Sequence, residues 1–257
     1  MVFIMSKISL KDFYGVLFTT TLASFLTPFT SSSISIALPI MSEEFHVSLA
    51  EMNWVLNSFL IALASTVLVM GRISDWADRE KIFLIGVSVF ALSSIGIILS
   101  SDFLSLLILR FIQGVSAAMI SGTTVAILSD RLPREMRGRA IGLNTTAVYL
   151  GLTLGPLAGG FLTNLYGWRS LFILKTLVSL TSLILGTRSL EMRGGRLGKP
   201  DLFTPTILSI SIATIILGTS NLNTSVGVAT SLIGSLLLVA TLYLEYKRPR
   251  TLHPKIF

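Results

Sequence analysis

Residues 71–81 of the chain read GRISDWADREK, a short polar stretch that is dense in charges of both signs. It lies between two long apolar runs, and apolar runs of similar length continue on both sides of that pair. A soluble protein lacks the polar surface to cover so many apolar segments, whereas a bilayer accommodates each of them as a helix. The sequence therefore predicts an all-α integral membrane protein in which residues 71–81 form a loop between two spans.

The composition separates the chain from soluble and nucleic-acid-binding proteins. Of its 257 residues, 52% are hydrophobic and 13% are charged, against roughly 25% charged residues in a soluble domain. The net charge of +7 does not form a basic stripe, because Lys and Arg lie in the loops between apolar runs. We therefore expect a lipid bilayer as a partner and no nucleic acid.

Eight apolar runs are long enough to cross a bilayer, which takes about 20 helical residues. We expect spans at 13–40, 52–71, 82–100, 104–128, 140–163, 169–189, 202–220 and 226–245. The polar, glycine-rich segment 191–200 separates the first six runs from the last two. The predicted domains are a six-helix bundle over 1–190, a cytoplasmic linker over 191–200, a two-helix segment over 201–245 and a cytoplasmic tail over 246–257.

The distribution of Lys and Arg predicts the orientation of the chain. Seventeen of the twenty lie on one side, in the amino-terminal segment, the 72–81, 131–139 and 188–199 loops and the carboxyl tail, and only Arg169 lies on the other side. Positively charged loops stay in the cytoplasm. We expect a multi-pass protein of the cell membrane with both termini cytoplasmic and an even number of spans.

Few residues have the chemistry of an active site. The chain has no Cys, and His46 and His253 have no second ligand at a metal-binding spacing. The serine-hydrolase, zinc-peptidase and dinucleotide-binding motifs are absent. We expect no enzyme activity, no cofactor and no metal site.

The remaining two cations, Arg110 and Lys175, lie inside apolar runs. Charges inside a span cost roughly 2.5–3.5 kcal/mol and usually face a bundle interior or a water-filled cavity. Each lies roughly 9–11 Å from the outer end of its helix at 1.5 Å per residue, so we expect the two at a similar depth. The alternative for Lys175 is that its amine snorkels to the outer interface. Gln113 and Gly114 follow Arg110 on nearly the same face and weaken that alternative for Arg110.

The 140–163 span carries Gly151, Gly155, Pro156, Gly159 and Gly160. Glycines four residues apart line one helix face and let a neighbouring backbone approach closely. Pro156 removes a backbone hydrogen bond and permits a kink. Two interpretations stay open, close helix packing alone or a bendable helix in a protein whose halves rock against each other.

Several motifs, in order and at matching spans, resemble the major facilitator superfamily and, within it, its fourteen-helix drug:proton antiporters. Residues 71–81 resemble the family signature between spans two and three, with Asp78 in place of its usual glycine. The run from Leu109 to Gly114 resembles the span-four Arg-x-x-Gln-Gly motif, and residues 151–160 resemble the antiporter motif of span five. Residues 34–39 and 137–140 match the end of the first span and the loop after the fourth.

The resemblance implies a six-helix N-terminal bundle of two inverted three-helix repeats, followed by two extra transmembrane helices, with the substrate path near the midplane. It implies that the conformational-switch loop, Gly71, Asp75, Arg79 and Lys81, and the span-five motif work against a second six-helix bundle. The chain ends at Phe257, shortly after its eighth apolar run. We therefore expect a half-transporter that works as a homodimer or with a separately encoded C-terminal half.

Two positions depart from the family pattern. Thr30 stands where the first span usually carries an acid, and Lys175 stands where the sixth span usually carries an amide. The interior has thus lost an acid and gained a base, and Arg110 stays charged in proteins. An anionic or zwitterionic substrate would fit these charges better than a cationic drug.

The expected function is secondary active transport of a small molecule, of the multidrug efflux type and coupled to an ion by antiport. The substrate cavity is expected near six residues, which are Thr30, Trp54, Asn57, Arg110, Gln113 and Lys175. Trp54 and Asn57, three apart on one helix, fit a helix–helix contact equally well. The alternative function is that of a non-transporting, truncated or regulatory membrane protein that associates with a full-length relative.

Overall fold

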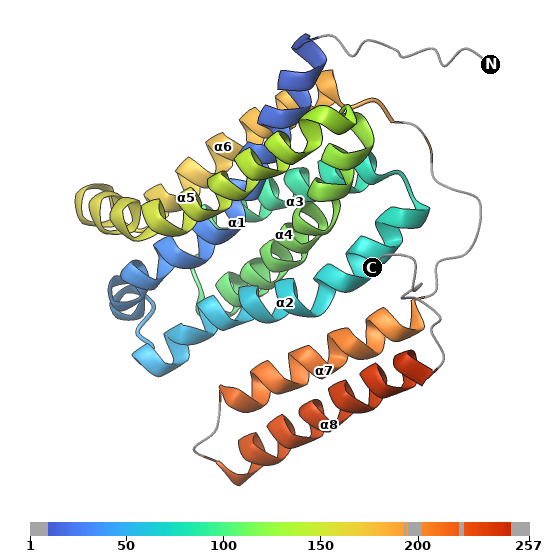
Figure 1. Ribbon diagram of the computed structural model, residues 1–257. Coiled ribbons are helices and arrows are strands. Elements are labelled where there is room, and N and C mark those ends of the chain that lie inside the picture. The colour runs from blue at the N-terminus through green and yellow to red at the C-terminus, as the bar shows by residue number, and fades with distance from the viewer. Residues whose placement is uncertain (1–9, 193, 195–201, 221–223, 248–257) are drawn as a thin grey trace, which may run out of the picture.

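The computed structural model describes residues 10–192, 194, 202–220 and 224–247, and this part of the chain is built from eight α-helices (Figure 1). They are α1 (Leu10–Glu44), α2 (Leu49–Trp76), α3 (Arg79–Leu99), α4 (Phe103–Arg131), α5 (Arg134–Tyr166), α6 (Arg169–Ser189), α7 (Phe203–Thr219) and α8 (Ser225–Lys247). Seven are long and apolar enough to cross a membrane, and α7 is shorter with 17 residues, about the minimum for a span. The predicted all-α class is confirmed, and the eight predicted runs correspond one to one to these helices.

Residues 71–81 do not form the loop that the sequence predicts. α2 continues to Trp76 and α3 begins at Arg79, so that only Ala77 and Asp78 lie between the two helices. Asp78 caps α3, because its Oδ1 accepts the backbone N–H of Lys81 at 3.0 Å. A carboxylate at this position satisfies a free backbone donor and complements the helix dipole. The polar residues therefore extend both helices beyond the apolar runs instead of interrupting them.

Polar caps also fix the turns at the other end of the bundle. Ser48 and Glu51 form a reciprocal capping box at the start of α2, in which each side chain accepts the other residue's backbone N–H. Asp102 precedes α4 and accepts the backbone N–H of Ser105 at 2.8 Å, which lowers the pKa of the Asp102 carboxyl. We call this end the capped end, and we call the end with the α2–α3 and α4–α5 turns the basic end.

Two hydrophobic clusters form the core of α1–α6. The cluster nearer the basic end contains Leu26, Phe59 and Phe90, and the cluster nearer the capped end contains Val55 and Phe172, each with further buried neighbours. The helices are held in a tight bundle, with α5 packed along α1, α4 packed along α2 and α3, and α6 packed along α1 and α3. All six helices therefore pack into one bundle, whose hydrophobic core consists of two clusters, one nearer each end.

The helices α7 and α8 form a hairpin that lies along α2 (Figure 1). Glycines let the two helices approach, since a Cβ on Gly234 would lie 2.8 Å from the backbone N of Ile215. The predicted boundary within 191–200 falls where only residues 191, 192 and 194 are described. Most of the predicted 246–257 tail lies outside the described residues.

The outer faces of the helices carry large apolar side chains. Leu92, Leu157 and Leu236 are 66%, 68% and 69% exposed. Apolar faces of this extent are stable in hydrocarbon or against another helix rather than in water. Together with the seven long apolar helices, they make this chain a membrane protein.

Candidate functional site

A layer of polar side chains separates the two hydrophobic clusters. On α4, for example, Leu106 belongs to one cluster and Ala117 to the other, and Arg110 and Gln113 lie between them. Similar positions on α1, α3 and α6 are also polar. We call this set the central polar layer; its members, each with 0% exposure, are Thr30, Ser33, Ser94, Arg110, Gln113, Lys175 and Ser179.

Arg110 ties three helices together within this layer. Its Nε donates to the carbonyl of Val55 on α2 at 3.0 Å, and its Nη1 donates to Gln113 Oε1 at 2.6 Å. Gln113 Nε2 in turn donates to Ser94 Oγ on α3 at 2.7 Å. The guanidinium also lies 4.5 Å from the ring centroid of Phe59, while Nη2 has no hydrogen-bond partner. Arg110 is therefore a structural centre of the bundle, with its Nη2 group left unpaired among the described residues.

Lys175 is the least compensated charge of the layer. Its Nζ has no hydrogen-bond partner within the described part of the chain and lies 4.1 Å from the ring centroid of Phe172. The alternative that this amine snorkels to the interface is wrong, because the side chain is fully buried. A desolvated cation–π contact contributes about 2 kcal/mol, which is less than the several kcal/mol that burying one ion costs.

Thr30 also lies in the central polar layer, on α1. The hydroxyls of Thr30 and Ser33 are buried without a hydrogen-bond partner among the described residues. The structure thus brings four of the six predicted site residues, Thr30, Arg110, Gln113 and Lys175, into one layer. None of these four lines the two open cavities described below.

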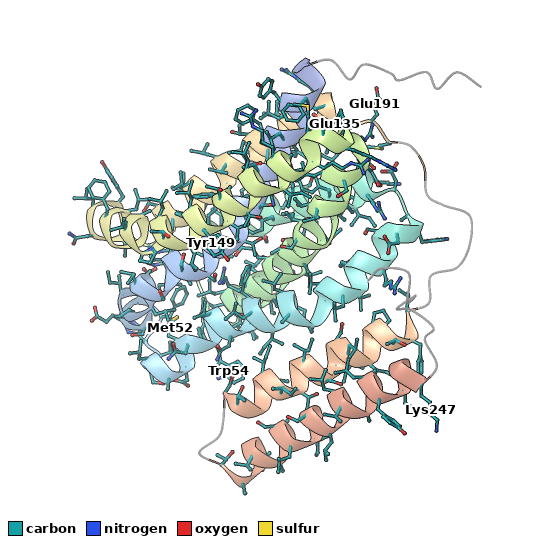
Figure 2. All side chains as sticks on the ribbon, in the orientation of Figure 1. Met52, Trp54, Glu135, Tyr149, Glu191 and Lys247 are labelled. Atoms are coloured by element: carbon teal, nitrogen blue, oxygen red, sulfur yellow. The ribbon has the colours of Figure 1, made fainter. Side chains whose placement is uncertain are left out.

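Trp54 and Asn57 lie elsewhere, in a groove of about 540 Å³ between α2 and the α7–α8 hairpin. Asn57 Nδ2 donates to Ser220 Oγ at the end of α7 at 3.4 Å. Trp54 is labelled on α2 beside this hairpin in Figure 2. For these two residues the structure favours the helix–helix contact over the shared substrate cavity.

An open cavity of about 530 Å³, which the sequence did not predict, is lined by α1, α4 and α5 and by Leu63 of α2, and we call it the α1–α4–α5 cavity. Tyr149 and Val125 at its rim are 64% and 49% exposed, and Tyr149 is labelled in Figure 2. Ser, Thr and Asn are plentiful in the apolar runs and pack helices as often as they bind ligands, so the sequence held no specific signal for this cavity. Its lining residues are Ser24, Thr27, Pro28, Ser31, Leu63, Ser121, Thr124, Val125, Asn144, Thr145, Val148 and Tyr149.

The predicted conformational-switch residues belong to a charge network at the basic end. Arg79 Nη2 donates to Asp75 at 2.6 Å, and Arg79 Nη1 donates to Asp130 at the end of α4. The next residue of each helix forms a second pair, in which Arg131 Nε donates to Glu80 at 2.6 Å, and this pair is buried. Two consecutive residues of α3 thus hold two consecutive residues of α4.

Gly71 and Lys81 enter this region through their backbones. A Cβ on Gly122 of α4 would lie 3.1 Å from the backbone N of Gly71, so α2 and α4 approach closely here. The N–H of Lys81 is the donor that Asp78 caps. The four predicted residues therefore share a neighbourhood, but only Asp75 and Arg79 contribute side chains to the ion pairs described above.

The segment after α6 is fastened onto the same network. Asp78 Oδ2 accepts the backbone N–H of Gly194 at 2.9 Å. Arg131 donates to the carbonyl of Glu191 and lies 3.5 Å from its carboxylate. Asp78, which replaces the glycine usual in the family signature, thus caps α3 and holds this segment at the same time.

The glycines of the span-five motif face α1. A Cβ on Gly155 would lie 1.9 Å from Ser32 Oγ, and those on Gly151 and Gly159 would lie 2.5 Å from α1 carbonyl oxygens. Gly160 has only Ile36 near it at 3.9 Å, and Pro156 is exposed. α5 remains a single helix through Pro156. Within the described chain, this arrangement favours the close-packing interpretation.

Comparison with known proteins shows which family the chain resembles. The sequence model of the Major Facilitator Superfamily matches residues 20–247. The major facilitator superfamily multidrug transporter mfsC of Aspergillus fumigatus is 31% identical over 239 residues, 90% of this chain and 46% of that protein. The tetracenomycin C resistance and export protein of Streptomyces glaucescens is 31% identical and covers 61% of this chain and 29% of its own length. The riboflavin transporter RibZ of Clostridioides difficile is 25% identical over 70% of this chain and 40% of that protein.

Solved structures share the fold. The POT family transporter PepTSo superimposes with a TM-score of 0.68 at 11% identity, covering 95% of this chain and 55% of its own. A peptide transporter POT in complex with sulfate also gives a TM-score of 0.68, at 15% identity. The chain spans less than half the length of the three curated relatives named above. Because the family match extends over most of its residues, the chain belongs to the major facilitator superfamily.

Proposed function

We propose that this chain is one half of a secondary active transporter that exports small molecules by ion-coupled antiport. The observation that carries the proposal is the α1–α4–α5 cavity, which has about 530 Å³ and an exposed rim, in a chain whose family and relatives are transporters. Ligand cavities are typically 300–1,000 Å³. A cavity of that size in the middle of a membrane bundle suits a substrate and not a structural void.

The second wall of the substrate path would come from another bundle. The cavity is open at its rim, where Tyr149 and Val125 are exposed. The relatives are more than twice as long as the region that matches this chain. Alternating access requires two bundles that rock around the site. The proposed partner is a second copy of this chain or a separately encoded C-terminal half.

Ion coupling is proposed for the central polar layer. Lys175 is the one member of this layer with a titratable amine, and that amine has no hydrogen-bond partner. Ionisable groups inside spans commonly mark proton pathways. In this proposal Lys175 exchanges the coupled proton, and Arg110 holds α2, α3 and α4 in position around it.

The charge network at the basic end is proposed as the conformational switch. Asp75, Arg79 and Asp130 join the start of α3 to the ends of α2 and α4, so a movement of these helices past each other has to break exposed ion pairs. Exposed pairs are weak, at about 0.2–1 kcal/mol each. They can therefore bias one state without locking it. The basic end is proposed to face the cytoplasm, with both termini on that side and the protein in the cell membrane.

Flux into proteoliposomes tests this function. Riboflavin is a suitable first probe, because one relative is named a riboflavin transporter and the molecule is fluorescent. We expect riboflavin movement that a pH gradient accelerates, and we expect Lys175→Met to remove that acceleration while downhill movement remains. Thr181→Val, on the exposed face of α6, is the matched control and should behave as the wild type.

The alternative function predicts a different result in the same experiment. A regulatory protein would show no flux of riboflavin or of other probes, alone or as a dimer, and would co-purify with a full-length relative whose flux it changes. The intact mass of the protein taken from its native membrane shows first whether the half exists as a free protein, because a free half has the 27.9 kDa of this chain.

A further inference from the structure

The walls of the α1–α4–α5 cavity carry no side chain that is charged at neutral pH. Its lining residues, all within the described chain, are Ser, Thr, Asn, Tyr, Pro, Leu and Val. A charged ligand would leave water without meeting an opposite charge, and burying an unpaired charge costs several kcal/mol. Arg110 and Lys175 lie outside this lining, so they offer no direct contact to an anion held there. The cavity therefore disfavours both cations and anions.

Three hydroxyl groups on the walls already donate their hydrogens within the protein. Ser31 Oγ donates to the carbonyl of Pro28 at 3.0 Å, and Thr124 Oγ1 donates to the carbonyl of Ile120 at 2.8 Å. Ser24 Oγ donates to Thr124 Oγ1 at 3.4 Å. Each hydroxyl has one hydrogen to donate and two lone pairs. Since these hydrogens are already engaged, the oxygens of Ser31 and Thr124 are available mainly as acceptors.

Asn144 is the strongest recognition element of the cavity. It is 6% exposed, and its Oδ1 is buried without a hydrogen-bond partner among the described residues. A buried acceptor without a donor costs about 1–3 kcal/mol, a cost that is removed if the amide of Asn144 turns its Oδ1 toward a donor in the cavity. The Oγ1 of Thr27, across the cavity on α1, is also without a partner.

We infer that the α1–α4–α5 cavity binds an uncharged, largely apolar molecule that forms a hydrogen bond with the side-chain amide of Asn144. Pro28, Leu63, Val125 and Val148 provide the apolar wall, and the engaged hydroxyls provide further acceptors. As a statement about substrate this inference rests on the proposed function. Its test is binding at equilibrium, so absent flux would defeat the proposed function and leave this inference standing.

Four aromatic probes of similar size and different charge make the test. The purified chain in lipid nanodiscs is dialysed against triphenylmethanol, triphenylmethane, tetraphenylphosphonium or tetraphenylborate, and empty nanodiscs measure partition into lipid. We expect triphenylmethanol to bind above the lipid background and to bind more tightly than triphenylmethane, which lacks the hydroxyl donor. Tetraphenylphosphonium and tetraphenylborate should stay at background.

Two substitutions at Asn144 separate the hydrogen bond from the charge. Asn144→Leu should weaken triphenylmethanol binding about three- to tenfold, the equivalent of one hydrogen bond, and should leave triphenylmethane unchanged, which also shows that the variant is folded. Asn144→Asp should bring tetraphenylphosphonium above background. Asn53 is an exposed residue of α2 outside this cavity. Asn53→Asp adds the same charge there and should leave tetraphenylphosphonium binding at background.

Two results would overturn the inference. One is wild-type binding of tetraphenylphosphonium or tetraphenylborate as tight as that of triphenylmethanol. The other is an Asn144→Leu variant that binds both neutral probes with wild-type affinity.

Discussion

Arg110 and Lys175 are both fully buried cations, but their surroundings differ. Among the described residues Lys175 has no hydrogen-bond partner, whereas Arg110 donates to Val55 and Gln113. Burying one ion without a partner costs several kcal/mol, a cost that an apolar side chain of similar volume avoids. We therefore predict that Lys175→Met raises the free energy of unfolding, and that Arg110→Met lowers it because Gln113 loses its donor.

Denaturant unfolding of the detergent-solubilised protein, followed by circular dichroism, measures both variants. A Lys175→Met protein that is less stable than the wild type would show that Lys175 has a partner under native conditions. If Arg110→Met were as stable as the wild type, the hydrogen bonds from Arg110 would contribute nothing to the bundle.

The span-five glycines allow a second prediction at the level of single residues. Gly155→Ala places a methyl group where Ser32 Oγ lies, at 1.9 Å, whereas Gly160→Ala meets only Ile36 at 3.9 Å. Overpacking typically costs about 1–3 kcal/mol. We expect Gly155→Ala to lower the unfolding midpoint and Gly160→Ala to leave it unchanged, and equal effects at both sites would mean that α5 does not pack on α1 through Gly155.

At the same scale, the sequence predicted the buried cations better than it predicted the cavity. A charge within an apolar run is visible in the sequence, and Arg110 and Lys175 are both fully buried. Hydroxyls such as Thr27 and Ser31 are common in packed helices, so their spacing alone does not distinguish a cavity wall from a helix contact. Asn144 becomes informative only when the structure shows its Oδ1 without a partner.

Between elements, the ion pair that joins α3 to α4 through Glu80 and Arg131 and the pair that joins α2 to α3 through Asp75 and Arg79 differ in burial. Glu80 and Arg131 side chains are 10% and 7% exposed, whereas Asp75, which pairs with Arg79, is 48% exposed. Removing one partner of a buried pair costs about 3–5 kcal/mol, and removing an exposed partner costs about 1 kcal/mol or less. We predict that Glu80→Gln strongly lowers the unfolding midpoint and that Asp75→Asn changes it little.

The same denaturant assay compares these two variants, which make matched acid-to-amide changes five residues apart. Equal losses would contradict the prediction and would mean that the exposed network carries as much stability as the buried pair.

The number and order of elements were predictable because each apolar run is one helix. The helix ends were not, because capping by Asp78 and pairing by Arg79 and Glu80 extend helices into sequence that is polar enough for a loop.

For the whole molecule, the sequence says more than the structure about sidedness, that is, which end of the bundle faces the cytoplasm. The packing of the helices does not show which end faces the cytoplasm. The distribution of basic residues does, because seventeen are expected on one side and one on the other. The position of α7–α8 along α2 could not be predicted, because it depends on the fit of small residues and on the contact between Asn57 and Ser220.

Sidedness can be measured directly, because the sequence contains no Cys. Gly138→Cys lies near the start of α5 with no atom within 4 Å of the new Cβ, and Ser101→Cys lies in the exposed α3–α4 turn at the opposite end. We predict that a membrane-impermeant maleimide added to intact cells labels Ser101→Cys and not Gly138→Cys, and that the pattern reverses in inside-out vesicles. The reverse pattern would place the basic end outside, and the charge network would then have to act on the far side of the membrane from any cytoplasmic partner.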